Sequence, residues 1–300
     1  MSGSIVVVGS LNADLVARVP AFPSPGETIT GSSFDIYPGG KGANQAYAAA
    51  RLGAEVHMIG RVGHDSHGRL LTSQLADVGV DTTRVVTDDS APTGTALITI
   101  DDSGQNEIVV VPGANGRVTV SDVEAGRQVI ESAGFVLLQL EVPLEAVAAA
   151  ARIAHSAGAI VILDPAPAHI GATSVLPQIN YVTPNETELT ALTAGEGLAT
   201  TLLDLGARRV VTKLGSAGAH LQDRNEEWSW PGFEVAPVDT TAAGDVWNGA
   251  FATALATGHD VDEAGRFANA AAAISVTRPG AQPSMPSREE VDAFISRSSP

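Results

Sequence analysis

The sequence Ile5-Val-Val-Val-Gly-Ser10 begins with four β-branched residues and ends in a glycine and a serine. A short, wholly apolar run that stops at a turn signal is typical of a strand buried on both faces in a parallel sheet. Similar apolar runs follow at residues 56–59, 135–138, 160–163 and 210–212. We therefore expect a sheet built mainly from buried parallel strands.

Segments with helical character, the earlier ones alanine-rich, lie between or after these runs. They cover residues 42–52, 144–157, 186–193, 244–257, 262–276 and 288–295. Alternating strands and helices at this spacing indicate βαβ units, in which helices cover both faces of a parallel sheet. The sequence thus predicts an α/β protein with a three-layer α/β/α arrangement.

Two stretches, residues 14–37 and 93–111, depart from this alternation. They contain alternating strand patterns and no helical pattern, and Pro23, Pro25, Gly26 and Gly31 punctuate the first. We interpret them as the strands of a small β lid inserted into a single domain of residues 1–300. Two separate surface hairpins are the alternative.

The composition excludes several classes of protein. Asp and Glu number 34 against 17 Lys and Arg, which gives a net charge of −17, while 44% of the residues are hydrophobic and none is cysteine. This hydrophobic content is too high for a disordered acidic tail, and the negative charge argues against nucleic acid or an anionic membrane as a partner. Without cysteine there is no disulfide, thiolate metal site or cysteine nucleophile. Since no signal-peptide or membrane-span pattern occurs, we expect a cytoplasmic location.

Residues 39–44, Gly-Gly-Lys-Gly-Ala-Asn, precede a predicted helix. Glycines allow a backbone to approach a ligand closely, and Lys41 and Asn44 supply hydrogen-bond donors. Lys41 and Lys213 are the only lysines, against fifteen arginines. A plain glycine turn is the alternative, and neither the P-loop nor the G-x-G-x-x-G nucleotide motif occurs in the chain.

Asn12 and Asp14 follow the first predicted strand, at the end of the sheet where α/β proteins bind ligands. Two residues apart, they face the same way, and a carboxylate with an amide can grip neighbouring hydroxyl groups. The alternative is that these side chains cap a turn.

Residues 238–245, Val-Asp-Thr-Thr-Ala-Ala-Gly-Asp, lead into an apolar helix. Small residues at a helix N-terminus expose backbone N–H groups that can bind an anion. A carboxylate beside such a site, here Asp245, could act as the base in phosphoryl transfer from ATP to an alcohol. Asp245 could instead only complement the helix dipole.

Residues 39–44 and 241–245 together resemble the two signatures of the ribokinase-like (PfkB-type) sugar kinases. Further segments match the family in order, and the resemblance spans essentially the whole chain; these segments are residues 9–14, 22–28, 139–141, 164–168, 183–188 and 278–284. The resemblance implies ATP-dependent phosphorylation of the 5-hydroxyl of D-ribose, which gives D-ribose 5-phosphate and ADP.

The resemblance also implies roles for individual residues. Asp245 would be the base, and the backbone N–H groups of Ala242, Ala243 and Gly244 would form the anion hole. The sugar would be held by Asn12, Asp14, Gly40, Lys41, Asn44, Glu141 and Asp245. ATP would contact Asn185, Lys213, Gly215, Ser216, Gly218, Gly244 and Asn269.

Cations and a partner subunit are implied as well. Magnesium would accompany ATP, with Asn185 and Glu188 linked to its use. An activating monovalent cation, usually potassium, would lie near Asp239, Thr241, Ser275, Arg278, Gly280 and Ser284. The lid strands would form a homodimer contact, for which Phe34, Ile36 and Ile98 provide apolar side chains.

Two residues depart from the family pattern. Lys213 stands where ribokinases commonly have threonine, and Trp247, which we expect to pack within its helix, stands where phenylalanine is usual. Alternative functions are a kinase for 2-deoxyribose, a ketohexose or a nucleoside, or a non-catalytic regulator that binds a sugar. Asn12, Asp14 and Lys41 favour a polyhydroxylated free sugar over a nucleoside.

Overall fold

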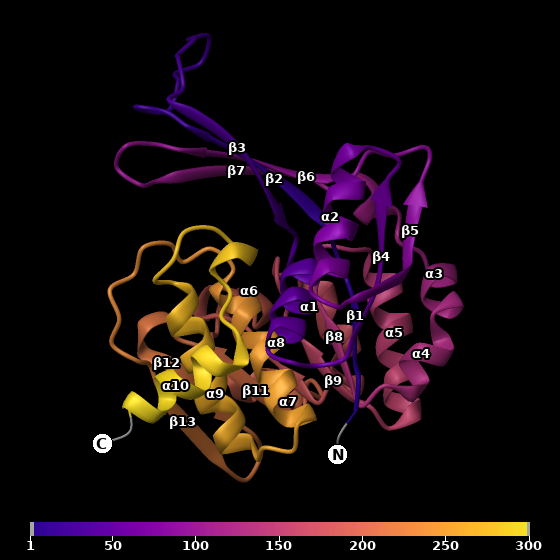
Figure 1. The fold of residues 1–300 in the computed structure, drawn as a ribbon. Helices are drawn as coiled ribbons and strands as arrows, with labels where there is room; N and C mark the ends of the chain where they lie inside the picture. The colour runs from indigo at the N-terminus through magenta and orange to yellow at the C-terminus, as the bar shows by residue number, and fades with distance from the viewer. Residues whose placement is uncertain (1–2, 299–300) are drawn as a thin grey trace.

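The computed structural model describes residues 3–298. Within them, a nine-stranded sheet has the order β13 (Glu227–Pro231), β12 (Gly218–Gln222), β11 (Arg209–Lys213), β10 (Tyr181–Val182), β9 (Ile160–Leu163), β8 (Phe135–Leu138), β1 (Ile5–Val8), β4 (Val56–Gly63) and β5 (Asp81–Asp88). Neighbouring strands are parallel except at the β11–β12 and β12–β13 pairs. The predicted, mostly parallel sheet is confirmed (Figure 1).

The two faces of β1 belong to two separate hydrophobic cores. Ile5 and Val7 pack into one cluster, and Val6 and Val8 pack into the other. All four side chains are fully buried. A strand covered on both faces needs an apolar residue at every position, which explains the unbroken run of β-branched residues.

Helices cover both faces of the sheet, so the predicted three-layer arrangement is confirmed. One core holds residues of α1 (Lys41–Arg51), α2 (Ser66–Asp77), α8 (Ala243–Ala256), α9 (Val261–Ser275) and α10 (Arg288–Ser298). The other core holds residues of α3 (Val120–Ala125), α4 (Arg127–Ser132), α5 (Leu144–Ala157), α6 (Glu186–Leu192) and α7 (Ala199–Asp204). None of these helices is long and apolar enough to span a bilayer.

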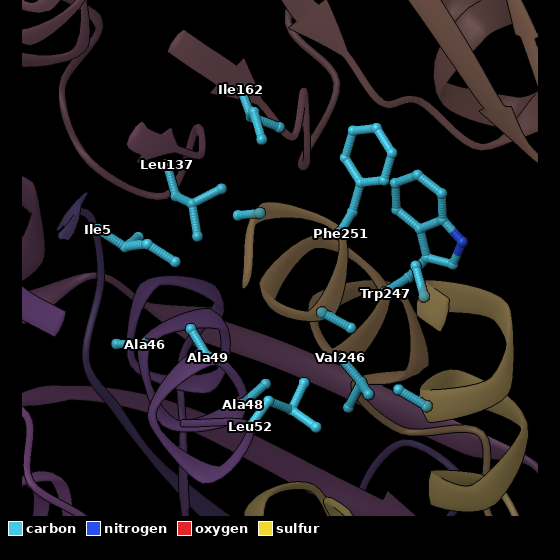
Figure 2. Packing of buried hydrophobic residues seen from close by; sticks show 14 of the residues in the cluster. Ile5, Ala46, Ala48, Ala49, Leu52, Leu137, Ile162, Val246, Trp247 and Phe251 are labelled. Atoms are coloured by element: carbon cyan, nitrogen blue, oxygen red, sulfur yellow. The ribbon is translucent and has the colours of Figure 1, made fainter. Parts of the chain in front are cut away.

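Helices α1 and α8 pack closely through small residues. A Cβ atom added at Gly249 of α8 would lie 2.8 Å from the Gln45 carbonyl oxygen and 2.9 Å from the Ala48 Cβ of α1. Figure 2 shows Ala48 and Ala49 of α1 on the side next to α8. The two helices carry Gln45 and Asp245, so their contact sets the spacing of the polar residues described below.

A second, four-stranded sheet projects from the body, with the order β3 (Ser33–Gly39), β2 (Asn12–Arg18), β6 (Gly94–Ile100) and β7 (Asn106–Val111) (Figure 1). Two antiparallel pairs, β2–β3 and β6–β7, join through the parallel β2–β6 pair. The two stretches that break the α/β alternation therefore form one sheet and not two separate hairpins. One face of this sheet is rich in exposed apolar side chains: Phe34, Ile36, Leu97, Val109 and Val111. The opposite face carries Asp14. It also carries Ile98, which pairs with Val16 and Ile108, so Ile98 does not share a face with Phe34 and Ile36 as the predicted dimer contact required.

Candidate active site

Polar side chains gather at the carboxyl ends of the parallel strands. Ser10 follows β1, Glu141 follows β8, Asp164 follows β9, Asn185 follows β10 and Lys213 ends β11. Because parallel strands end on the same edge of a sheet, ligands in α/β proteins bind there. The site is completed by the N-termini of α1 and α8, which lie over this edge.

Asp245 lies in the first turn of α8 and is 5% exposed. Its Oδ2 accepts a hydrogen bond from Asn44 Nδ2 at 3.0 Å, and its Oδ1 accepts one from Gln45 Nε2 at 3.1 Å. Burial raises the pKa of Asp245 above its usual value, Lys41 opposes this rise, and Asp164 adds to it. A fixed carboxylate with a raised pKa is a stronger base than a free aspartate.

Lys41 stands at the start of α1 among carboxylates. Burial opposes its charge, but Asp245, Asp164 and Glu141 outweigh burial and raise its pKa above the ordinary value. Lys41 therefore stays protonated at neutral pH. Its ammonium group compensates part of the negative charge of the site.

The glycine turn before α1 is anchored by Glu141. Glu141 Oε2 accepts a hydrogen bond from the Lys41 backbone N–H at 3.0 Å and one from the Ser10 hydroxyl at 2.5 Å. Gly40 has φ 88°, and a Cβ atom there would lie 2.6 Å from the Asn12 nitrogen. Only glycine fits this turn, because both its backbone conformation and its proximity to β2 exclude a side chain.

Asn12 and Asp14 begin β2, in place of the turn that was the alternative reading. Asp14 is half-buried, and a Cβ atom added at Gly39 would lie 2.1 Å from its Oδ2. Burial, followed by the charges of Glu141 and Asp245, raises the pKa of Asp14 to about 7. Asp14, Glu141 and Asp245 therefore lie close to one another and belong to one cluster of predicted sugar-binding residues.

Two supporting residues escaped the sequence reasoning. Asn115 Nδ2 donates to Asn12 Oδ1 at 2.7 Å and so orients the Asn12 amide. Gln45 Nε2 donates both to Asp245 and, at 3.0 Å, to Asp164 Oδ2, while Gln45 Oε1 accepts from Gln139 at 2.6 Å. Gln45 directly follows Asn44, so the resemblance pointed to its neighbourhood. No sequence pattern marked Asn115.

The start of α8 has an unusual backbone. Ala242 caps the helix with φ 60° and ψ 11°, a left-handed conformation that is uncommon for a residue with a side chain and carries strain. The Ala243 N–H donates to the Thr240 carbonyl oxygen at 3.2 Å. The Ala243 N–H, one of the three predicted anion-hole donors, is therefore engaged within the turn. Ala242, Ala243 and Gly244 form the N-terminus of α8.

A cavity of about 850 Å³ lies on the other side of this helix start. Four predicted ATP-binding residues line it: Gly215, Ser216, Gly218 and Asn269. Its remaining wall comes from residues 232–237, Thr240, Ala243, the α9 residues Ala272 and Ala273, and Val276, which follows α9. Sequence reasoning missed the 232–237 wall, since that segment shows no motif. The mixture of apolar walls and backbone groups suits a flat aromatic base.

Asn269 is held by hydrogen bonds at this cavity. Its Nδ2 donates to the Trp230 carbonyl oxygen at 2.7 Å, and its Oδ1 accepts from the Trp247 indole N–H at 2.8 Å. Trp247 also stacks on Phe251, with ring centroids 4.8 Å apart. Trp247 therefore packs within its helix as expected, and it fixes the Asn269 side chain as well.

Asn185 and Glu188 form a capping box at the start of α6. Asn185 Oδ1 accepts from the Glu188 N–H, and Glu188 Oε2 accepts from the Asn185 N–H, both at 2.8 Å. Asn185 also forms an isolated β-bridge with Lys213. Glu188 also adds to the negative field that raises the pKa of Lys41.

The six residues predicted for a monovalent cation come from residues 239–241 and from residues 275–284, which begin at the last residue of α9, and Asp239 joins the two segments. Its Oδ1 accepts from the Thr241 N–H and its Oδ2 from the Gly280 N–H, both at 2.9 Å. The Ser275 and Ser284 hydroxyls donate to the carbonyl oxygens of Ala272 and Ala281 at 2.8 and 2.7 Å. The Arg278 guanidinium instead pairs with Glu290 of α10, so only its backbone could serve a cation.

Known proteins match this chain over nearly its whole length. The pfkB family carbohydrate kinase model matches residues 2–288. A ribokinase of Haemophilus influenzae is 44% identical, and the match covers 98% of this chain and 99% of that protein. A deoxyribokinase of Salmonella typhi is 35% identical, with 97% and 98% covered. The structure of an Arabidopsis thaliana ribokinase complexed with ribose and ATP has a TM-score of 0.88 and 36% identity, with 98% of this chain and 99% of that chain covered.

Proposed function

The chain belongs to the pfkB family of carbohydrate kinases, and on that premise we propose that it transfers the γ-phosphoryl group of ATP to the 5-hydroxyl of D-ribose. The products are D-ribose 5-phosphate and ADP. One observation carries the proposal: a buried carboxylate, Asp245, and a wall residue of the nucleotide-sized cavity, Ala243, lie in the same helical turn. A sugar on one side and ATP on the other would meet at this turn.

In this mechanism Asp245 takes the proton from the sugar hydroxyl, and the hydroxyl oxygen attacks the γ-phosphorus in line with the leaving ADP. Asn44 and Gln45 hold the Asp245 carboxylate, while Asn12, Asp14 and Glu141 orient the sugar through its other hydroxyls. The backbone N–H groups of Ala242 and Gly244 stabilise the negative charge that develops on the phosphoryl oxygens, and the Ala243 N–H would have to leave the Thr240 carbonyl oxygen to join them.

Two cations complete the proposal. Magnesium would enter with ATP and neutralise phosphate charge, and Asn185 and Glu188 lie at the edge of the site that would face it. For a monovalent cation, we propose potassium near the two segments that Asp239 joins. The carboxylate, hydroxyl and carbonyl oxygens of these segments fit a hard cation. Because Asp239 and Thr241 directly precede the anion hole, a cation there would stabilise its backbone without touching the sugar.

The projecting sheet supports a proposed lid and a homodimer. Its inner face carries Asp14, so movement of this sheet would cover the sugar and exclude water. Its outer face bears five exposed apolar side chains, Phe34 among them, which form the kind of surface that a second copy would bury. The use of ATP fits a cytoplasmic location.

2-Deoxyribose is the second candidate substrate, because a full-length relative 35% identical is a deoxyribokinase. Ketohexoses and nucleosides remain further candidate substrates. A non-catalytic regulator is disfavoured by the intact base and helix N-terminus.

One experiment tests the proposal. ADP release is measured with a coupled assay over pentoses, 2-deoxyribose, hexoses and nucleosides, in potassium and in a bulky organic cation at equal ionic strength. D-ribose should give the highest kcat/KM, and potassium should raise the rate. A higher value for another acceptor would replace ribose as the substrate, and equal rates in both salts would remove the potassium site.

A further inference from the structure

Lys213 occupies a position between the nucleotide cavity and the base. It ends β11, and Leu214 separates it from the 3₁₀ turn Gly215–Ala217, whose first two residues line the cavity. Its backbone N–H donates to the Pro184 carbonyl oxygen at 2.8 Å. The side chain is only 13% exposed, so the ammonium group points into the protein at the edge where the polar residues gather.

The Lys213 ammonium group is held by Asp164. Nζ donates to Asp164 Oδ1 at 2.9 Å, and the Asp164 side chain is 2% exposed. Asp164 Oδ2 accepts from Gln45 Nε2, which also donates to Asp245 Oδ1. A continuous set of hydrogen bonds therefore links Lys213 through Asp164 and Gln45 to the base.

The ammonium group also lies beside the start of α8. A Cβ atom added at Gly244 would be 3.3 Å from Lys213 Nζ. A phosphoryl group bound at this helix N-terminus, next to Asp245, would thus lie within reach of the ammonium group. Since Lys41 and Lys213 are the only lysines of the chain, this charge is one of very few available to offset the carboxylates and an incoming polyphosphate.

We propose that Lys213 is a catalytic residue that contacts the transferring phosphoryl group, with Asp164 as its positioning residue. This inference rests on the proposed function. As the O–H bond of the sugar breaks, its proton passes to Asp245 and the oxygen forms a bond to the γ-phosphorus. The bond from the γ-phosphorus to the bridging oxygen breaks, and its electron pair stays on ADP. The Lys213 ammonium group keeps its protons and offsets the charge on the phosphoryl oxygens throughout.

The test compares Lys213→Met, the double variant Lys213→Met/Asp164→Asn and Arg208→Met. The single change leaves the buried Asp164 carboxylate without its ion-pair partner, which can destabilise the protein, and the double variant removes that carboxylate charge. Arg208→Met removes an exposed positive charge five residues upstream and serves as the matched control. We expect kcat to fall by roughly 10²-fold in both Lys213 variants, as for loss of a transition-state donor, with a sugar KM close to normal and an unchanged control.

A second measurement separates contact with the γ-phosphoryl group from effects on ADP. By calorimetry, the Lys213 variants should lose affinity for a non-hydrolysable ATP analogue and keep most of their affinity for ADP. Recovery of kcat in the double variant would overturn the proposal, because Lys213 would then serve only to neutralise Asp164. Near-normal kcat in the single variant would overturn it as well.

Failure of the proposed function has a different signature. If the unmodified enzyme phosphorylates another acceptor better than ribose, the same comparison is made with that acceptor. If no acceptor is phosphorylated, the proposed function fails, and the analogue-against-ADP comparison decides the Lys213 contact by itself. Equal losses of affinity for both nucleotides would then count against it.

Discussion

The two sides of the α8 N-terminus bind their ligands by different means. The sugar side consists of buried charged and amide side chains, Asp245, Asn44 and Gln45 among them, that hold one another in place. The nucleotide side is a cavity with apolar walls, in which small residues and backbone groups predominate. Substitution of a polar side chain on the sugar side should therefore have a large and selective effect on catalysis or sugar binding. Nucleotide binding should respond mainly to changes in side-chain volume.

The largest effect is expected for Asp245→Asn. The variant keeps the size and polarity of the side chain but cannot accept the proton, so kcat should fall by about 10²–10⁴-fold. The backbone N–H groups remain, and nucleotide affinity should change little. The measurement is kcat of the purified variant, with thermal melting as the control for folding. A folded variant with near-normal turnover would show that Asp245 only complements its helix dipole.

Asp14→Ala should come next. The loss of a charged hydrogen-bond partner costs about 1.5–3 kcal/mol of binding free energy, which corresponds to roughly 10–150-fold weaker sugar binding. ATP binding should be nearly unchanged, since Asp14 lies on the sugar side. Calorimetry with each ligand separately checks both expectations. Unchanged sugar affinity would remove Asp14 from the site.

The nucleotide side is tested by volume with Ala273→Phe. Ala273 lines the cavity from α9 and is 9% exposed. A phenyl ring in the space of the ligand should raise the KM for ATP by about tenfold, within the range that overpacking costs. Sugar affinity should stay constant, as measured by calorimetry. If sugar binding weakened as much as ATP binding, the two sides would not be separable.

An effect of the same size as that of Ala273→Phe is expected for the pH dependence of sugar binding. The pKa of Asp14 is raised to about 7, and the ionised form is the better acceptor for sugar hydroxyls. Sugar affinity should therefore increase by about tenfold from pH 6 to pH 8, following the ionised fraction. Asp14→Asn is the control, in which this dependence should disappear. A dependence that survives in Asp14→Asn would belong to another group, such as Asp245.

As pH rises, the contribution of Asp14 to folding stability should change in the opposite direction to sugar affinity. Because the folded pKa of Asp14 exceeds its unfolded value, the folded state binds more protons between about pH 4 and pH 7, and the contribution of Asp14 to stability falls as pH rises through this range. The site thus gains its binding-competent charge under conditions where that charge destabilises the unliganded fold.

The sequence was sufficient for the features that depend on local pattern. The apolar run at Ile5–Val8 and the alanine-rich segment at Leu144–Ala157 became β1 and α5 with unchanged bounds. Strand β5 and helix α7 were missed. β5 lies at the edge of the sheet and alternates only weakly between buried and exposed residues, and α7 is a short helix of six residues without a side-chain cap.

The residues of the site also divide into those that a local sequence pattern identifies and those that it does not. Asp245 and the Gly39–Asn44 turn could be identified because they belong to contiguous motifs. Asn115, which orients Asn12, and the ion pair between Asp164 and Lys213 could not, since their partners lie 103 and 49 positions apart in the chain. Such pairings are fixed by tertiary packing, about which local periodicity carries no information.

The close contact between α1 and α8 gives the small residues of these helices a role in the geometry of the site. Because Gly249 and Ala48 allow the two helices to approach until a single added methyl group would clash, the distance from Asn44 and Gln45 to Asp245 is set by the absence of side-chain bulk. A larger residue at Gly249 would push α8 away from α1 and displace Asp245 from its hydrogen-bond donors without altering any catalytic atom. In an evolving population or an engineered library, these small residues should therefore tolerate exchange as little as the carboxylates they position.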